Sequence, residues 1–394
     1  MRYDDIIYGT IDIPPEIWNL FKFPEMVRLR GVSQAVLPAE CNPYCATPSR
    51  FHHGIGVWHL AKNLCKKAEF RHLELDLPLA GLLHDAGDTP FSHLGDSFLR
   101  DATGLDGETH LVKILADSEL TIALSNLGAD VKRICRLVAG KEKPWSELLN
   151  GTLDLDNLDH VLRYGVSRGF FDRHYYNPHT IISAIHFDQA ANSLYLDAEL
   201  VVEIHWWKQA RRKIYAGGVY AEPHLGLAMM LYRAVEIAYD QGEISGSFWR
   251  FTDAEALDYL EKKCNPATAC LVRRVRGLEI YPLVKKWEDG EGAPLLKKPA
   301  DWKIRRALAD QIAQTLDLAK HQVAAYVGLG REERQVKIPS YKNGMKDLYW
   351  DSACYNSKWR IRIYIDGELT PAQKEKLQAL DLAAICAGAE KEEV

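Results

Sequence analysis

The stretch LPLAGLLHDAG at residues 77–87 decides the fold of this chain, because an apolar run ends there in two adjacent polar residues. The run up to Leu83 is typical of a buried helix, and His84 and Asp85 stand at its last turn. A buried imidazole beside a buried carboxylate is costly unless both are hydrogen-bonded or bound to a cation. For an isolated pair, a hydrogen-bonded helix terminus would be the better interpretation. This pair is not isolated.

Two further segments offer ligands to the same site. RFHHGIGVWHLAKNL, residues 50–64, has apolar residues at helical spacing, and His53 stands at the start of this pattern. LDLDNLDHVLR, residues 153–163, has a similar spacing that Asp156 interrupts. Imidazole and carboxylate are good ligands for divalent metals, and three helices that each offer one or two ligands suit a site in the core of a helical bundle. The sequence therefore predicts a mainly α fold built around a metal ion.

These motifs resemble, in their order, the H…HD…D signature of the HD-domain phosphohydrolase superfamily. RFHHGIGV resembles the pattern RFxHSxGV, HDAGDTPFSH resembles HDxGHxPFSH, and LDLDNLDHVLR resembles xDVDxxDYxxRD, all found in the deoxynucleoside triphosphate (dNTP) triphosphohydrolase branch. The resemblance covers about residues 4–235 and implies a helical-bundle HD core. The implied metal ligands are His53, His84, Asp85 and Asp156.

The resemblance also implies a metal-dependent mechanism. The four ligands accept iron, manganese, zinc, nickel or cobalt, and a magnesium ion could join as a second ion. The ion would polarise a phosphoryl oxygen and lower the pKa of a bound water, while arginines and histidines neutralise the developing charge. The residues implied in catalysis are His110, His93 and Asp88. His110, ahead of His93, would protonate the leaving oxygen.

Five residues are implied in substrate binding: Arg50, Arg212, Tyr220, His160 and Asn157. Guanidinium groups suit phosphate oxygens, so the two arginines would hold the phosphate. Each of them could equally be an ordinary ion-pair partner. The tyrosine could pack near a sugar or simply be a core aromatic residue. Arg163 and Asp159, close to the metal aspartate, are expected to anchor neighbouring groups rather than to bind metal.

Three positions depart from the pattern of the branch. Asp88 stands where the branch has a phosphate-facing histidine, and Asn157 and His160 replace a lysine-like group and a tyrosine. A carboxylate at position 88 would repel a triphosphate. It would therefore bind a second cation, be protonated or turned toward a base such as His93, or accept a hydrogen bond from a sugar hydroxyl.

Three functions remain open because of these departures. The leading one is hydrolysis of a dNTP to a deoxynucleoside and triphosphate. The second is a phosphodiesterase or phosphatase activity on another nucleotide, either cyclic, oligomeric or a monophosphate. The third is a nucleotide sensor without catalysis.

Composition is that of an ordinary globular protein and fits this interpretation. The 394 residues are 47% hydrophobic, enough for one large core or two modest ones. A net charge of −5 gives no basic field, so nucleic-acid binding is not indicated. The sequence contains no run of 18 apolar residues, so a membrane span is not expected. The eight scattered cysteines are typical of reduced thiols in a cytoplasmic protein. The expected partner is a nucleotide substrate.

The chain divides by its pattern into three parts. Residues 1–49 form an N-terminal segment, residues 50–240 the HD core, and residues 241–394 a small α+β C-terminal region. AIHFD and SLYLDA in the core predict a small hairpin. In the C-terminal region, we expect a helix over residues 302–327 and a strand at KWRIRIYID, with one basic and one buried face.

The N-terminal segment carries two expectations. YDDIIYGTIDIPP alternates like a short hairpin that leads into a helix. The segment also has large apolar side chains on what would be a surface arm, namely Trp18, Phe21, Phe23 and Met26. We therefore expect this segment to form subunit contacts in a symmetric homo-oligomer, a dimer or larger.

Overall fold

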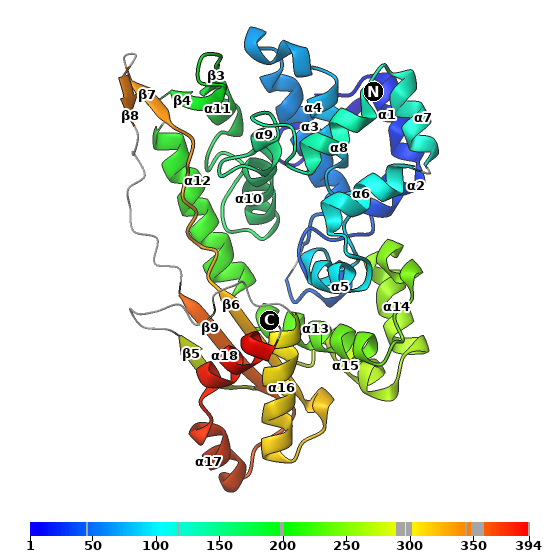
Figure 1. Ribbon diagram of the computed structural model, residues 1–394, viewed down its shortest axis with the longest axis vertical. Helices are drawn as coiled ribbons and strands as arrows, with labels where there is room; N and C mark the ends of the chain where they lie inside the picture. Colours follow the sequence, from blue (N-terminus) through cyan, green and yellow to red (C-terminus); the bar gives the residue numbers. More distant parts are fainter. Residues whose placement is uncertain are drawn as a thin grey trace. The chain divides into compact units, whose positions relative to one another are not determined.

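Helices dominate the chain, as the sequence predicts (Figure 1). The computed structural model describes residues 1–44, 46–116, 118–197, 201–288, 296, 302–342, 345–347 and 358–392. The chain forms two compact units. Unit 1 comprises Met1–Ala35, Tyr44–Ala216 and Glu333–Tyr355, and unit 2 comprises Val36–Pro43, Gly217–Glu332 and Asn356–Val394.

Unit 1 contains the motifs singled out in the sequence. Its helices are α1 (Pro15–Trp18), α2 (Pro24–Leu29), α3 (Arg50–Leu64), α4 (Asp76–Leu83), α5 (His93–Thr103), α6 (Gly107–Ala116), α7 (Glu119–Asn126), α8 (Val131–Val138), α9 (Glu147–Asn150), α10 (Leu155–Ser167), α11 (Pro178–Ser183) and α12 (Val201–Ile214). Its strands are β1 (Arg2–Asp5), β2 (Gly9–Asp12), β3 (Ile185–Asp188), β4 (Ser193–Asp197), β7 (Ser340–Lys342) and β8 (Met345–Asp347).

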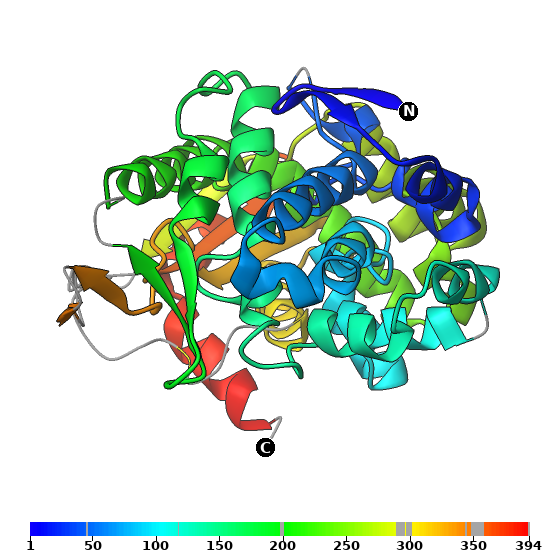
Figure 2. The same ribbon diagram turned by 90° about the horizontal axis from the view of Figure 1, so that it is seen from above.

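The two predicted hairpins of unit 1 are confirmed. β1 and β2 pair antiparallel, and this hairpin is the dark-blue ribbon at the N-terminus in Figure 2. β3 and β4 also pair antiparallel, and the sheet extends through β7 to β8.

The N-terminal segment is not the apolar surface arm that its composition suggested. Phe21 and Met26 are buried in the core of unit 1, and Trp18 and Phe23 are partly buried against the same core. These side chains therefore pack within their own chain rather than forming an apolar surface.

Close contact between α3 and α4 forms the centre of unit 1. Ser49 caps α3 by accepting a hydrogen bond from the backbone of His52. After its first residue, α4 is apolar and buried, so it packs on several sides at once. Gly54 on α3 and Gly81 on α4 allow the close approach: a Cβ atom on Gly54 would lie 2.8 Å from the carbonyl oxygen of Leu82.

Unit 2 joins a small sheet to the C-terminal helices. It contains α13 (His224–Asp240), α14 (Asp253–Lys263), α15 (Pro266–Arg276), β5 (Leu283–Glu288), α16 (Trp302–Leu316), β6 (Val323–Leu329), β9 (Trp359–Ile365), α17 (Pro371–Ala379) and α18 (Leu382–Glu392). The sheet order is β5-β9-β6, with antiparallel pairing throughout. In β9, Ile361 and Ile363 are buried while Arg360 and Arg362 pair with acids, as predicted.

The predicted helix over residues 302–327 is wrong in its second half. The helix α16 ends at Leu316, where Asp317 adopts a left-handed backbone with φ of 54°. Residues from Val323 then form β6, whose valines pair with β9. The β-branched residues favour the strand once a partner strand is present, which a helical spacing could not indicate.

Among the described residues, no helix combines the length and apolarity needed to cross a membrane.

The glycine contact between α3 and α4 yields a prediction on stability. Gly54→Ala places its methyl against backbone that cannot move aside, and we expect a loss of about 1–3 kcal/mol. Gly81→Ala meets a side-chain methyl instead, the Cγ1 atom of Val57 at 2.9 Å, so its cost should be smaller. Urea unfolding of both variants measures the difference. Equal losses would contradict the idea that backbone contact sets the spacing.

Candidate active site

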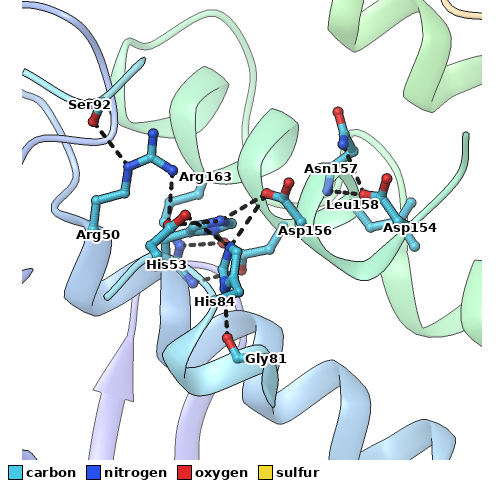
Figure 3. Close-up of polar contacts among 12 residues, drawn as sticks. Arg50, His53, Gly81, His84, Ser92, Asp154, Asp156, Asn157, Leu158 and Arg163 are labelled. Carbon is cyan, nitrogen blue, oxygen red and sulfur yellow. Dashed lines mark hydrogen bonds and ion pairs between the residues drawn. The ribbon is translucent and has the colours of Figure 1, made fainter. Parts of the chain in front are cut away.

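Three of the predicted metal ligands meet at one point of unit 1. His53 lies in the first turn of α3, His84 directly follows α4, and Asp156 lies in the first turn of α10. The Nε2 atom of His53 is 3.0 Å from Oδ1 of Asp156, and Nε2 of His84 is 3.9 Å from the same oxygen. One ligand atom from each residue falls within 4.8 Å of the others, a spacing suited to one metal ion. Figure 3 shows the two imidazoles turned toward Asp156.

The state of His84 supports a cation at this point. Its Nδ1 donates to the carbonyl oxygen of Gly81 at 2.8 Å, so the lone pair is on Nε2. Within the described parts of the chain, this buried Nε2 atom makes no hydrogen bond. A buried lone pair beside a carboxylate is costly unless a cation binds it. The residues present therefore fit a divalent metal.

Asp85, the fourth predicted ligand, lies beside both histidines. Its Oδ1 is 3.3 Å from Nε2 of His84, and its Oδ2 is 3.8 Å from Nε2 of His53. The Oδ2 atom also accepts a hydrogen bond from Nη1 of Arg50 at 2.9 Å. Burial favours the neutral acid, but Arg50 and the two histidines outweigh it and lower the pKa of Asp85 to about 2. Asp85 is therefore an anion that Arg50 orients beside the metal ligands.

Arg50 also contacts Asp88, the residue that departs from the family pattern. Nη2 of Arg50 is 3.3 Å from Oδ2 of Asp88, and its Nε donates to Oγ of Ser92 at 3.1 Å. Burial and the charge of Asp85 raise the pKa of Asp88 to about 7 despite Arg50. The single cluster with metal-binding spacing among the described residues does not include Asp88. The second cation therefore remains a prediction.

The other nitrogen of His53 is held by a buried acid. Nδ1 donates to Oδ2 of Asp159 at 2.8 Å, which fixes the tautomer that points Nε2 at the metal ligands. Arg163 binds both oxygens of Asp159, at 2.8 and 2.9 Å. Burial opposes ionisation, but Arg163 and His53 keep the pKa of Asp159 well below its usual range. Arg163 thus anchors a neighbouring acid, as predicted.

The three histidines predicted near the substrate have different surroundings. His110 is buried, and its Nδ1 donates a hydrogen bond to the carbonyl oxygen of Gly87 at 2.9 Å. Gly87 is three residues after His84. His93 pairs with Asp96 at 3.0 Å, and its Nε2 is 3.5 Å from Nη2 of Arg50. The ring of His160 lies 6.2 Å from that of His53, and burial lowers its pKa to about 3, so it is neutral.

An arginine of α12 contacts a predicted site residue at the start of α10. Asp154 caps α10 by accepting a hydrogen bond from the backbone of Asn157 at 2.7 Å (Figure 3). Oδ1 of Asn157 accepts a hydrogen bond from Nη1 of Arg211 at 3.1 Å. Arg212, the predicted phosphate ligand, instead pairs with Glu333 at 2.5 Å, and 44% of its side chain is exposed. Of these two neighbouring arginines, the buried one that contacts a predicted site residue is thus Arg211.

Tyr220 belongs to unit 2. There its hydroxyl accepts a hydrogen bond from the backbone of Arg331 at 3.0 Å, and the guanidinium of Arg360 stacks over its ring at 5.0 Å. Its predicted contact with a sugar remains a prediction.

Sequence reasoning missed two candidate residues. Arg211 was missed because the family resemblance matched its neighbour Arg212, whereas in the structure Arg211 is buried and donates a hydrogen bond to Asn157. Gln34 is 3% exposed, and neither polar atom of its side chain has a partner in the described residues. It is next to Ser33, whose carbonyl accepts a hydrogen bond from Ser92. No sequence signal marked Gln34.

Residues 50–164 match the model of the HD domain family, so this part of the chain is an HD domain. The segment contains all four predicted metal ligands. HD domains bind divalent metals, and the family includes phosphohydrolases. The predicted resemblance to the HD superfamily is confirmed over these residues.

Curated relatives point to one branch of this class. The deoxynucleoside triphosphate triphosphohydrolase SAMHD1 homolog of Dictyostelium discoideum is 29% identical over 183 residues, covering 41% of this chain and 35% of that protein. The corresponding SAMHD1 enzyme of Gallus gallus is 34% identical over 107 residues, covering 24% of this chain and 16% of that protein. The matches thus span about a third or less of these relatives.

One solved structure shares the fold along the whole chain. A hypothetical protein from Aquifex aeolicus, solved at 2.0 Å, has a TM-score of 0.76 and 20% identity, covering 96% of this chain and 99% of its own.

The ligand cluster yields a prediction on metal content. We expect about one tightly bound divalent transition ion per chain, and His84→Ala or Asp156→Ala should weaken its binding by about 100-fold or more. His52→Ala is the matched control, because this exposed neighbour of His53 contacts Ser49 instead. Elemental analysis after dialysis measures the effect. Unchanged metal in both ligand variants would rule out this site.

Proposed function

We propose that this protein is a metal-dependent phosphohydrolase that cleaves a phosphoester bond of a nucleotide. The leading form of the reaction is conversion of a dNTP to a deoxynucleoside and triphosphate. The observation that carries the proposal is the convergence of His53, His84 and Asp156, with Arg50 and Asp85 at their side. The dNTP substrate is inferred from the names of the relatives.

The residues would divide the work of catalysis. A divalent ion held by His53, His84 and Asp156, with Asp85 as the fourth ligand, would supply Lewis-acid activation of a phosphoryl oxygen and of water. Arg50 would bind phosphate oxygens. His110, with its Nδ1 proton held by Gly87, would donate a proton to the leaving oxygen from Nε2 when it is protonated.

Arg211 supports a phosphate-binding role better than its neighbour does. Its side chain is 5% exposed and packs over the ring of Tyr215 at 4.5 Å. Within the described residues, no carboxylate pairs with it and its Nε has no acceptor. A buried cation without a counter-ion is costly, and an anionic ligand removes that cost. We therefore propose that Arg211 binds a substrate phosphate.

One assay tests the function directly. The metal-loaded protein is incubated with dNTPs, ribonucleoside triphosphates, monophosphates and cyclic nucleotides, and chromatography identifies the products. The leading form requires a deoxynucleoside and intact triphosphate in a 1:1 ratio. Loss of metal should abolish turnover. A metal-loaded protein that hydrolyses none of these would leave the sensor function instead.

Asp88 favours a second candidate function. The Asp88 carboxylate lies 3.3 Å from the guanidinium of Arg50. It therefore offsets part of the positive charge that would be needed to bind a triphosphate. A substrate with fewer charges, such as a cyclic nucleotide or a monophosphate, would need less compensation. The same panel separates this phosphodiesterase or phosphatase from the dNTP enzyme.

The adjacent arginines yield a matched pair of variants. Arg211→Ala should lower kcat/KM by about 10- to 100-fold, the effect of losing a charge-assisted hydrogen bond of about 1.5–3 kcal/mol. Arg212→Ala removes a partly exposed ion pair with Glu333 and should change kcat/KM by about twofold or less. The reverse order of effects would restore Arg212 as the phosphate ligand.

Assembly and location complete the proposal. The homo-oligomer stays a prediction, and Val202 and Trp206, 64% and 43% exposed on one face of α12, are two of the exposed apolar residues that could form a contact. Light scattering at micromolar concentration should give at least twice the mass of one chain, and Trp206→Glu should reduce it. A monomer mass for the wild type would contradict this.

The six described cysteines are free thiols, in keeping with the proposed cytoplasmic location.

A further inference from the structure

A line of buried charges connects the N-terminal hairpin to the metal ligand His53. Nη1 and Nη2 of Arg163 donate to the two oxygens of Asp5, at 2.8 and 3.2 Å. The same guanidinium binds Asp159 through Nε and Nη2, and Asp159 accepts the Nδ1 proton of His53. The Asp5 side chain is therefore linked to the predicted metal ligand His53 by three successive contacts, through Arg163 and Asp159.

Water does not reach this line of charges. The side chains of Asp5 and Arg163 are each 1% exposed, and those of Asp159 and His53 are fully buried. Two carboxylates share one guanidinium, so the group has an excess negative charge next to the imidazole. In a buried site this excess is balanced by whatever cation His53 binds. The arrangement thus favours metal binding as well as folding.

The line of buried charges fits against α3 because position 56 is a glycine. A Cβ atom on Gly56 would lie 1.9 Å from Oδ1 of Asp159 and 2.6 Å from Nη2 of Arg163. Glycine at this position lets the bidentate pair lie directly against α3, beside His53.

Asp5 has two separable tasks. Its Oδ1 accepts hydrogen bonds from the backbone of Ile7 at 2.8 Å and Tyr8 at 3.1 Å, which shapes the hairpin turn. An asparagine could do the same with its single side-chain oxygen. The second oxygen and the negative charge serve Arg163. The turn alone does not account for a buried carboxylate.

We propose that Asp5 is a positioning residue for the metal ligand His53 and acts through Arg163 and Asp159. Asp5 holds the guanidinium in the plane that lets it bind Asp159, and it offsets the positive charge that would otherwise weaken the hydrogen bond from His53 to Asp159. This inference rests on the metal centre of the proposed function, but not on the identity of the substrate.

Cobalt(II) binding tests the proposal without any nucleotide. The full chain is stripped with a chelator and titrated with Co²⁺, whose visible absorption reports both affinity and ligand geometry. Asp5→Asn keeps the size of the side chain and an acceptor for the turn but removes the charge. We expect Co²⁺ affinity to fall by about 10-fold, the lower end for groups outside the ligand shell, with a changed absorption band.

Two further variants separate positioning from folding. Asp4→Asn is the matched control on the same strand, because Asp4 is exposed and accepts a hydrogen bond only from Thr10 among the contacts described for it; its Co²⁺ affinity should stay within twofold of wild type. Asp5→Glu keeps the charge but displaces the turn acceptor, so it should retain most of the Co²⁺ affinity even if its Tm falls.

The outcomes are distinct. Equal Co²⁺ affinity for Asp5→Asn and Asp4→Asn, or a loss with Asp5→Glu as large as with Asp5→Asn, would overturn the positioning role. A wild-type chain that binds no Co²⁺ would overturn the metal centre together with it. Failure of the nucleotide panel with normal Co²⁺ binding would contradict the proposed substrate class alone.

Discussion

The hydrogen bond from His53 to Asp159 is the interaction on which the rest of the site depends. It joins α3 to α10 in the interior of unit 1 and fixes which nitrogen of the imidazole faces the other ligands. Both groups are fully buried, so neither can be satisfied by water. The close packing of α3 on α4 then brings His84 to the same point, and the geometry of the candidate metal site results from how the helices pack.

Much of this site could be predicted from the sequence because its residues interrupt apolar helical spacing. His84 ends a buried run, and Asp156 breaks the spacing of its own helix, so each stands out as a polar group in an apolar setting. The hairpins could also be predicted, since alternation reports a strand with one buried face. These signals are local, and they succeed where local pattern and tertiary packing agree.

Other features could not be predicted because they depend on contacts between distant residues or on small shifts in register. The choice between Arg211 and Arg212 depends on which of the two faces α10, where Arg211 contacts Asn157. The strand β6 lies within an apparently helical stretch because β9, more than thirty residues later, pairs with it. Trp18 and Phe21 look like a surface arm until the core of unit 1 is known to include them. Nothing local distinguishes Asp5 from Asp4.

The separation of 158 residues between Asp5 and Arg163 has a consequence for biosynthesis. Translation at about 5–20 residues per second leaves roughly 8–30 s between the appearance of the two partners. During that interval the Asp5 carboxylate has no Arg163 to pair with, and His53 has no Asp159 to orient it. The interior of unit 1 around Asp5 therefore cannot close before α10 has been synthesised, because removing an unpaired carboxylate from water is costly.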